Sequence, residues 1–278
     1  MTNQPLRLGK SVDTYWQALA GSLDDVRVYN RVLSATEVRQ LYQLGGDKVA
    51  SAATLQNGTT LGSGLVGYWS FNGADVTDKV YDRAGTNHGY LYNAATSSAK
   101  VQGKLGQGLN FDGAAAYVDL GDVQDQAGSF SLAAWVKRTG NSNGQAGTII
   151  GKEMSSNHQF FLEVQDSDAS NANKIRFAIW DVDTTQYSAT TLQNNKWYHI
   201  VATYDDTTKA KTIYINGVSD SVVTGSGSPV ANSDTLKIGY SQGTSNANNY
   251  FNGSIDEVRL YNRALSAGEV LQLYQLGK

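Results

Sequence analysis

The sequence predicts an all-β protein, a two-sheet antiparallel sandwich of the jelly-roll type with a short C-terminal helix. Two observations carry this prediction. From Leu65 onward, short runs rich in β-branched and aromatic residues are separated by Gly, Asn and Asp turns. A helical period appears only near the C-terminal end. With 40% hydrophobic and 10% aromatic residues, the chain has enough apolar side chains for a sizeable core.

The expected strands follow one another at short spacing. Residues 130–136 alternate in the way that a half-buried strand does. Asn216-Gly217 comes directly after a strand-like run and predicts a tight hairpin turn. The complete series of expected strands is 65–71, 108–112, 116–120, 130–136, 148–150, 160–164, 175–180, 197–204, 212–215, 236–239 and 255–261.

The last element is expected to be a short helix. Ser266 and Glu269 have the spacing of a capping box, in which each residue hydrogen-bonds the backbone of the other. Val270, Leu273 and Tyr274 then give the helix one apolar face.

Composition and charge exclude several classes of function. A net charge of −3 without a basic cluster provides no field for nucleic acid. No apolar run reaches the roughly 18 to 20 residues that span a bilayer, so membrane insertion is not expected. The chain has no cysteine for disulfides or thiolate metal sites. Many Gly and Tyr residues and only 17% charged residues suit an extracellular or cell-surface protein. The fragment carries no signal sequence, so export would depend on one upstream.

An internal repeat is the most informative feature of the chain. Residues 21–45 and 253–277 align without gaps and are identical at 19 of 25 positions. Residues 6–9 also match residues 236–239 after a two-residue shift. We therefore expect a tandem-repeat protein, in which only the end of the preceding repeat is present.

The repeat sets the expected domain organisation. Residues 1–47 are interpreted as the C-terminal strands and helix of a preceding incomplete repeat, too short to bury a core alone. Residues 48–64 are small and polar and are interpreted as a linker. Residues 65–278 are expected to form one complete domain.

Several ordered motifs of the complete repeat resemble a known family. They are Gly64-Leu-Val-Gly-Tyr-Trp-Ser-Phe71, Tyr81-Asp-Arg-Ala-Gly-Thr-Asn-His-Gly89, Phe111-Asp-Gly113, 130–136, 196–205, Ile215-Asn-Gly217 and 255–266. Together they are similar to bacterial laminin-G-like domains of the concanavalin A-like lectin/glucanase superfamily. The resemblance implies the sandwich fold. It is weak for function, because this fold carries lectins, binding modules, adhesins and glycosidases.

The resemblance also implies one structural calcium ion. Carried over to this sequence, Asp82, Asn87 and Asp256 would be its ligands, and their oxygens suit this cation. The alternative is that Asp82 forms a local turn with backbone N–H groups and that Asp256 is a surface residue. Three His residues without ligand spacing make zinc a poor expectation.

A sugar-binding surface is expected where aromatic rings meet polar side chains. Trp69, Trp135 and Trp197 lie in framework motifs and are interpreted as core residues. Trp180 ends a strand and is followed by carboxylates and a tyrosine, which suits a ligand platform. An equally good interpretation places Trp180 over the sandwich edge. The candidate ligand-binding residues are Trp180, Asp181, Asp183, Tyr187, His158 and Asn248.

No catalytic motif is found, so we do not expect an enzyme. Retaining glycosidases need two carboxylates a few ångströms apart. Glu163 and Asp166 would point to opposite faces of one strand, as would Asp256 and Glu257. The expected function is a non-catalytic extracellular binding module, calcium-stabilised, with a glycan or polysaccharide as partner. The alternatives are an adhesive or structural repeat that binds a cell-surface protein, and an accessory module of a glycoside hydrolase.

Overall fold

The computed structural model describes most of the region from Leu61 to the C-terminus and a few residues before it. The described residues are 8–9, 19, 21, 26, 28–34, 61–77, 79–94, 96–123, 125, 127–142, 144–154, 157–180, 182, 185–242 and 248–278. The side chains of residues 97 and 153–158 are outside this description. The chain divides into two compact units, Met1–Gly46 and Asp47–Lys278. The assignment of residues 1–47 to a preceding repeat stays a prediction.

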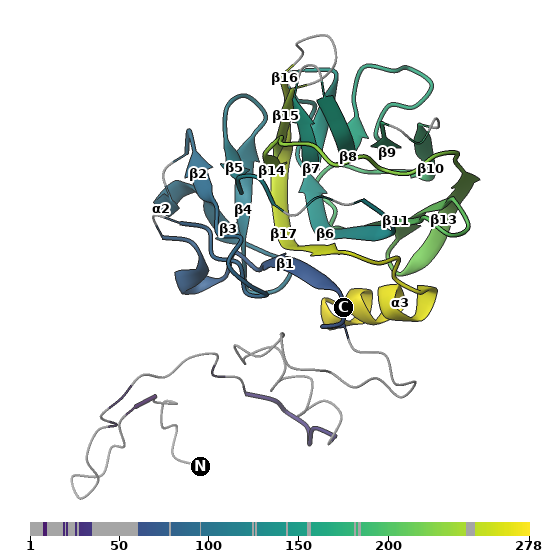
Figure 1. The fold of residues 1–278 in the computed structure, drawn as a ribbon. Helices are drawn as coiled ribbons and strands as arrows, with labels where there is room; N and C mark the ends of the chain where they lie inside the picture. Colours follow the sequence, from purple (N-terminus) through teal and green to yellow (C-terminus); the bar gives the residue numbers. More distant parts are fainter. Residues whose placement is uncertain are drawn as a thin grey trace, which may run out of the picture. The chain divides into compact units, whose positions relative to one another are not determined.

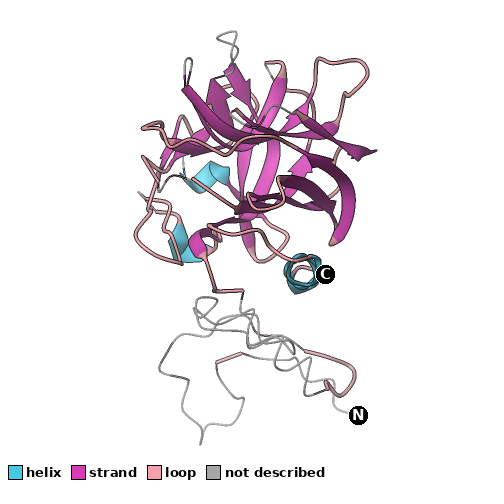
Figure 2. Cartoon of the chain, turned by 45° about the vertical axis from the view of Figure 1, so that its right-hand side comes forward, coloured by secondary structure: helices cyan, strands magenta, loops and turns pink. Residues whose placement is uncertain are grey.

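Two antiparallel sheets form the sandwich that the sequence predicts (Figures 1 and 2). The first has the order β13 (Val218–Thr224), β12 (Ala210–Ile215), β11 (Tyr198–Asp205), β6 (Phe130–Arg138), β17 (Asn252–Tyr261), β4 (Gln107–Asp112) and β3 (Lys100–Gln102). In addition, β1 (Leu65–Trp69) pairs with β17. The second has the order β10 (Gln186–Thr191), β9 (Lys174–Ile179), β8 (Asn157–Gln165), β7 (Ala146–Met154), β14 (Leu236–Ile238), β5 (Tyr117–Asp119) and β2 (Tyr90–Tyr92).

A few short elements complete the second unit. A hairpin of β15 (Tyr240–Gln242) and β16 (Asn248–Tyr250) packs beside β7. The helices are the 3-10 turn η1 (Gly73–Asp75), α2 (Thr96–Ala99) and α3 (Ala267–Leu276). Within the described residues, no helix is long and apolar enough to cross a membrane.

The hairpin turn between β12 and β13 forms where the sequence predicts it. Asn216 and Gly217 have φ angles of 53° and 82°, and Ile215 pairs with Val218 across them. Both central residues are therefore left-handed, as a type I′ turn requires.

Strand β6 shows how the core is built. Phe130, Leu132 and Ala134 point into the core between the sheets. Ala133 points the other way, into a second apolar cluster beneath α3. The sequence predicts that this strand is half-buried, and that prediction is wrong, because α3 covers its outer face.

Helix α3 is fixed by its cap and by its apolar face. Ser266 and Glu269 form the predicted capping box. Val270 and Leu273 are buried against the outer face of the first sheet, in a cluster that includes Leu61. The sequence assigns Leu61 to the linker. In the structure, however, Leu61 is packed with the domain.

The framework tryptophans have three different environments. Trp69 is fully buried in the core between the sheets, as the sequence predicts. Trp135 is buried on the outer face, stacked on Tyr274 of α3 at 5.6 Å between ring centroids. Trp197 is half-buried, beneath the ammonium group of Lys137. The core interpretation therefore holds for Trp69, whereas Trp135 helps to dock α3.

His199 lies buried beneath α3, where a charged imidazole is disfavoured. Its ring is 5.1 Å from that of Trp135, and its Nδ1 has no hydrogen-bond partner. Burial, followed by the charge of Arg259, lowers the pKa of His199 to about 3. The unfolded chain takes up this proton near pH 6.5, so stability is complete above that pH and falls as the pH decreases toward 3.

We expect His199→Gln to reduce this loss. At pH 4 the imidazole should destabilise the wild type by about 3 kcal/mol relative to neutral pH. Urea unfolding of both proteins at pH 7 and pH 4 measures the difference. Equal losses of stability in the two proteins would show that other groups cause the acid sensitivity.

Candidate functional site

Four tyrosine rings form one connected surface at the side of the second sheet. Tyr92 stacks on Tyr117 with 5.1 Å between centroids and 9° between planes. Tyr117 lies 5.3 Å from Tyr240, which stacks on Tyr250 at 4.5 Å. Tyr92 is 44% exposed and the other three are half-buried. We call these four residues the tyrosine platform.

Strand register brings the four rings together. Tyr92 pairs with Tyr117 between β2 and β5, and Tyr240 pairs with Tyr250 between β15 and β16. Val118, which follows Tyr117 on β5, is buried in the core. Because side chains alternate along a strand, Tyr117 and the paired Tyr92 point to the opposite, outer face.

Gly239 joins β14 to β15 and so places Tyr240 beside the sheet. Its φ angle is 84°, and a Cβ there would lie 2.3 Å from the ring of Phe111. Only glycine fits this left-handed, crowded position. The platform therefore depends on a glycine that no local pattern of aromatic residues would reveal.

Polar groups lie at the edge of the tyrosine platform. The hydroxyl of Tyr240 donates a hydrogen bond of 3.1 Å to Oδ1 of Asn248, which is exposed. Burial and then the carboxylate of Asp119 raise the pKa of Tyr117 above its usual value of 10. Asp119 itself lies 3.8 Å from the ammonium group of Lys237. The Tyr117 phenol is therefore neutral at physiological pH and can donate and accept hydrogen bonds.

Of the other predicted sugar-binding residues, the structure describes the side chains of Tyr187 and Asn248, and neither is shown in contact with Trp180. Trp180 is 54% exposed at the end of β9. Tyr187 on β10 pairs with Arg176 on β9. Arg176 precedes Trp180 by four residues, so Tyr187 lies about 13 Å from Trp180 along the strand direction. Asp181, Asp183 and the side chain of His158 lie outside the described residues. Among the predicted residues whose side chains the structure describes, Asn248 contacts the tyrosine platform.

The predicted calcium ligands already serve the backbone. Asp82 Oδ1 accepts hydrogen bonds from the N–H groups of Tyr68 (2.9 Å) and Ala84 (2.8 Å), and its Oδ2 accepts from Asn87 (3.1 Å). The side-chain Nδ2 of Asn87 donates a hydrogen bond to the backbone carbonyl of Val66. These contacts match the turn that the sequence offers as the alternative.

The third predicted ligand contacts a different loop. Oδ2 of Asp256 accepts hydrogen bonds from the backbone of Lys104 (2.8 Å) and Leu105 (2.9 Å). Asp256 is fully buried, so the prediction of a surface residue is wrong. In the part of the chain described, no three His, Cys, Asp or Glu side chains cluster as metal ligands. Oδ1 of Asp256 is buried without a hydrogen-bond partner. The calcium site at Asp82, Asn87 and Asp256 stays a prediction.

We expect Asp82→Ala to destabilise the domain equally with calcium and with chelator. The change leaves three backbone N–H groups without their charged acceptor, which costs about 2 to 3 kcal/mol. Thermal unfolding in calcium and in EGTA measures this. A wild-type Tm that rises with calcium, while that of the variant does not, would instead establish a metal site at Asp82.

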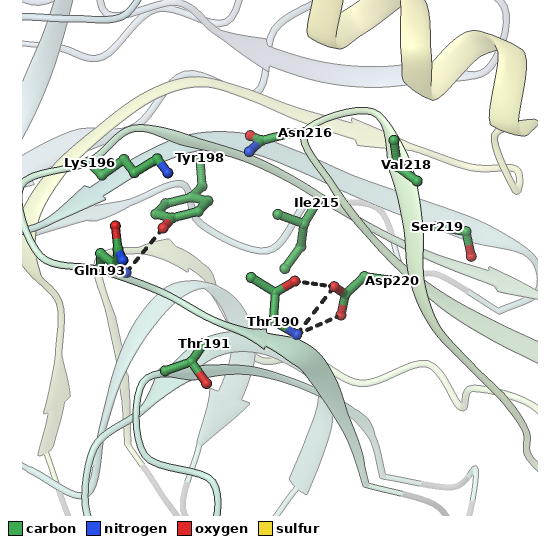
Figure 3. A pocket seen from close by; sticks show the side chains of 10 residues that line it. All are labelled: Thr190, Thr191, Gln193, Lys196, Tyr198, Ile215, Asn216, Val218, Ser219 and Asp220. Carbon is green, nitrogen blue, oxygen red and sulfur yellow. Dashed lines mark hydrogen bonds between the residues drawn. The ribbon is translucent and has the colours of Figure 1, made fainter.

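A separate pocket of about 390 Å³ lies between β10, β11 and the β12–β13 hairpin (Figure 3). Its carboxylate, Asp220, accepts hydrogen bonds from the backbone of Ala189 (2.6 Å) and Thr190 (3.2 Å). Its phenol, Tyr198, accepts one from the backbone of Gln193 (3.2 Å). The carboxylate of Asp220 and the hydroxyl of Tyr198 are thus paired within the protein.

Glu163 and Asp166 contact different partners. Glu163 is fully buried and lies 2.5 Å from Arg176, whereas Asp166 pairs with Arg138 at 2.7 Å. Burial raises the pKa of Glu163 to about 7, although Arg176 acts in the opposite direction. Each carboxylate thus has its own cation. The expectation that the chain is not an enzyme stays a prediction.

Comparisons with known proteins agree with the fold. Domain 4 of AbnA, a GH43 extracellular arabinanase from Geobacillus stearothermophilus solved with arabinotriose, is 19% identical with a TM-score of 0.57, covering 76% of this chain and 98% of that domain. Trypanosoma rangeli sialidase in complex with the inhibitor DANA is 18% identical with a TM-score of 0.57, covering 86% of this chain and 37% of the sialidase. The binding domain of Paraclostridial Mosquitocidal Protein 1 is 16% identical with a TM-score of 0.55, covering 76% and 52%.

These identities support the sandwich fold alone. No curated protein matched the chain by sequence. A laminin-G family model matches residues 112–271, more than half of the chain. The chain therefore belongs to the laminin-G-like family of the concanavalin A-like lectin/glucanase superfamily.

Proposed function

We propose that this domain is a non-catalytic carbohydrate-binding module that holds a glycan or polysaccharide on the tyrosine platform. The observation that carries the proposal is the continuous contact of four rings beside an exposed amide, Asn248. Sugar rings have apolar C–H faces that pack on aromatic rings, and their hydroxyls need nearby donors and acceptors. The platform supplies both kinds of contact.

The charges around the platform favour a neutral sugar. Asp119 lies beside Tyr117 and is close to Lys237, so each partly neutralises the other. The net charge of the whole chain is −3. We therefore expect neutral hexose or pentose chains to bind better than sulfated or uronic acid chains.

An extracellular location is part of the proposal. The structural neighbour from the arabinanase is a domain of an extracellular enzyme, and it was solved with an oligosaccharide. This supports a role as an accessory module of a larger glycoside hydrolase or as a surface lectin. An adhesive or structural repeat that binds a cell-surface protein is the alternative.

An array of neutral and charged polysaccharides, probed with the wild type and with Trp180→Ala, tests the proposal. We expect both proteins to bind the same neutral class with affinities that agree within about twofold, because Trp180 is not part of the platform. Loss of binding in Trp180→Ala would move the site to the end of β9. A blank array with a folded protein would contradict carbohydrate binding and favour a protein partner.

A further inference from the structure

The pocket in Figure 3 lies at the other edge of the second sheet from the tyrosine platform. Its volume of about 390 Å³ is within the range of small-molecule sites. β10 is the edge strand of the second sheet and β13 that of the first, and both line the pocket. Five strand spacings separate β10 from β5, which carries Tyr117, so the two regions are about 24 Å apart across the sheet. A sugar residue in this pocket therefore cannot contact the platform.

Asp220 connects the two edge strands and forms one end of the pocket. Its carboxylate, on β13, accepts hydrogen bonds from the backbone N–H groups of Ala189 and Thr190 on β10 and from the hydroxyl of Thr190. A carboxylate has about four acceptor sites, so these three donors leave room for one more. Asp220 can thus accept a hydrogen bond from a ligand hydroxyl, while its charge is already stabilised by β10.

Lys196 forms the other end of the pocket. Figure 3 shows its side chain at the far side of Ile215 from Asp220. Lys196 is exposed, and its ammonium group lies 5.4 Å from the centroid of the Tyr198 ring. Among the described residues, no carboxylate forms an ion pair with this ammonium group. The pocket therefore has a cation without a counter-charge at this end, which favours an anionic ligand group.

The lining between the two ends combines apolar surface with amides. Ile215 is buried and Val218 is 66% exposed. Oδ1 of Asn216 accepts a hydrogen bond of 3.0 Å from the backbone of His199, which fixes the orientation of this amide. In the described part of the chain, its Nδ2 and the side chain of Gln193 have no hydrogen-bond partner. The lining thus offers an apolar surface and uncommitted amide groups, which together suit a sugar ring and its hydroxyls.

We propose that this pocket binds the terminal sugar residue of a glycan when that residue carries a carboxylate, as a uronic acid does. The sugar carboxylate pairs with Lys196, a sugar hydroxyl donates to Asp220, and the ring packs on Val218. The site is separate from the tyrosine platform and does not depend on its proposed function. A domain with both sites would hold a neutral chain at one edge and an acidic chain end at the other.

An NMR titration of the full chain with galacturonic acid and with galactose tests this proposal, because the two sugars differ in the carboxylate alone. We expect galacturonic acid to shift the amide signals of Gln193, Lys196 and Asn216 saturably, and galactose to bind about tenfold more weakly or less. Lys196→Met should reduce the affinity for galacturonic acid to that for galactose, and Lys196→Arg should retain it. Lys137→Met is the matched control, because this ammonium group also lies over an aromatic ring, that of Trp197 at 5.2 Å, outside the pocket.

Further arms separate the two sites and exclude a simple anion. The double variant Tyr92→Ala, Tyr240→Ala should bind galacturonic acid as the wild type does, whatever the platform binds. Equal affinities for the two sugars, or an unchanged affinity in Lys196→Met, would overturn the proposal. Acetate that binds as tightly as galacturonic acid would also overturn it, since the pocket would then hold an anion and no sugar. So would the absence of saturable shifts at the pocket.

Discussion

The double variant Tyr92→Ala, Tyr240→Ala should lose glycan binding by at least about 100-fold while the sandwich stays folded. The two rings stand at different points of the tyrosine platform, one from β2 and one from β15. Each is in stacking contact with a second ring, so its removal also exposes a neighbour. Aromatic residues at the centre of a binding surface contribute about 2 kcal/mol or more each.

Tyr90→Ala is the matched control for this prediction. Tyr90 lies on the same strand as Tyr92 and is 47% exposed, against 44% for Tyr92. Its ring lies beneath the ammonium group of Lys79 and outside the stacked set. Isothermal titration with the best-binding oligosaccharide should give wild-type affinity for Tyr90→Ala. Equal losses in the control and the double variant would contradict a role for the platform.

Glu257→Ala should lower the free energy of unfolding by about 3 to 5 kcal/mol, the largest effect expected on stability. Its carboxylate accepts hydrogen bonds from the hydroxyl of Tyr68 at 2.8 and 2.9 Å and from Arg259 at 2.7 Å. All three side chains are buried, and the guanidinium of Arg259 lies 4.2 Å from the Tyr68 ring. Without Glu257, the charge of Arg259 stays buried and has lost its ion-pair partner.

Tyr68→Phe separates this charge effect from the loss of a hydrogen bond. It removes one hydroxyl and leaves the ion pair in place, so we expect a loss of about 1 to 2 kcal/mol. Guanidinium unfolding of the wild type and both variants gives the comparison. If Glu257→Ala cost no more than Tyr68→Phe, Arg259 would be neutralised by another group and the account of the buried pair would fail.

Local patterns predict the strands and caps well because they depend on neighbours in sequence. The alternation in residues 130–136 identifies β6, and Ser266 with Glu269 marks the start of α3. Burial of the outer face of β6 could not be predicted in this way. It depends on where α3 packs, more than 100 residues later in the chain.

The candidate site depends on contacts between distant segments, and sequence patterns identify it only in part. Tyr92 and Tyr117 meet Tyr240 and Tyr250 through the register of β2 with β5 and of β15 with β16. Asn248 was a candidate because its loop is polar and contains a tyrosine. For Tyr92, on the β2 side of the platform, the sequence pattern that could have indicated the site is the alternation Tyr90-Leu91-Tyr92, which places two tyrosines on one face of a strand.

The calcium site at Asp82, Asn87 and Asp256 stays a prediction, because the sequence does not show which side-chain atoms the fold engages. Residue types at Asp82, Asn87 and Asp256 suit calcium, but type alone does not show which atoms are free. Backbone N–H groups from two different loops contact both oxygens of Asp82 and Oδ2 of Asp256, whereas Oδ1 of Asp256 is buried without a hydrogen-bond partner. Only three-dimensional contacts reveal that Asp82 and Asp256 accept hydrogen bonds from the backbone, whereas the side chain of Asn87 donates one.

The measurement that tests the central claim most directly is an NMR titration with the oligosaccharide selected by the array, observing tyrosine rings and tryptophan indoles together. The account predicts that saturable shifts are confined to Tyr92, Tyr117, Tyr240 and Tyr250, with the Trp180 indole unchanged. Shifts at the Trp180 indole without any change at these four tyrosines would contradict it.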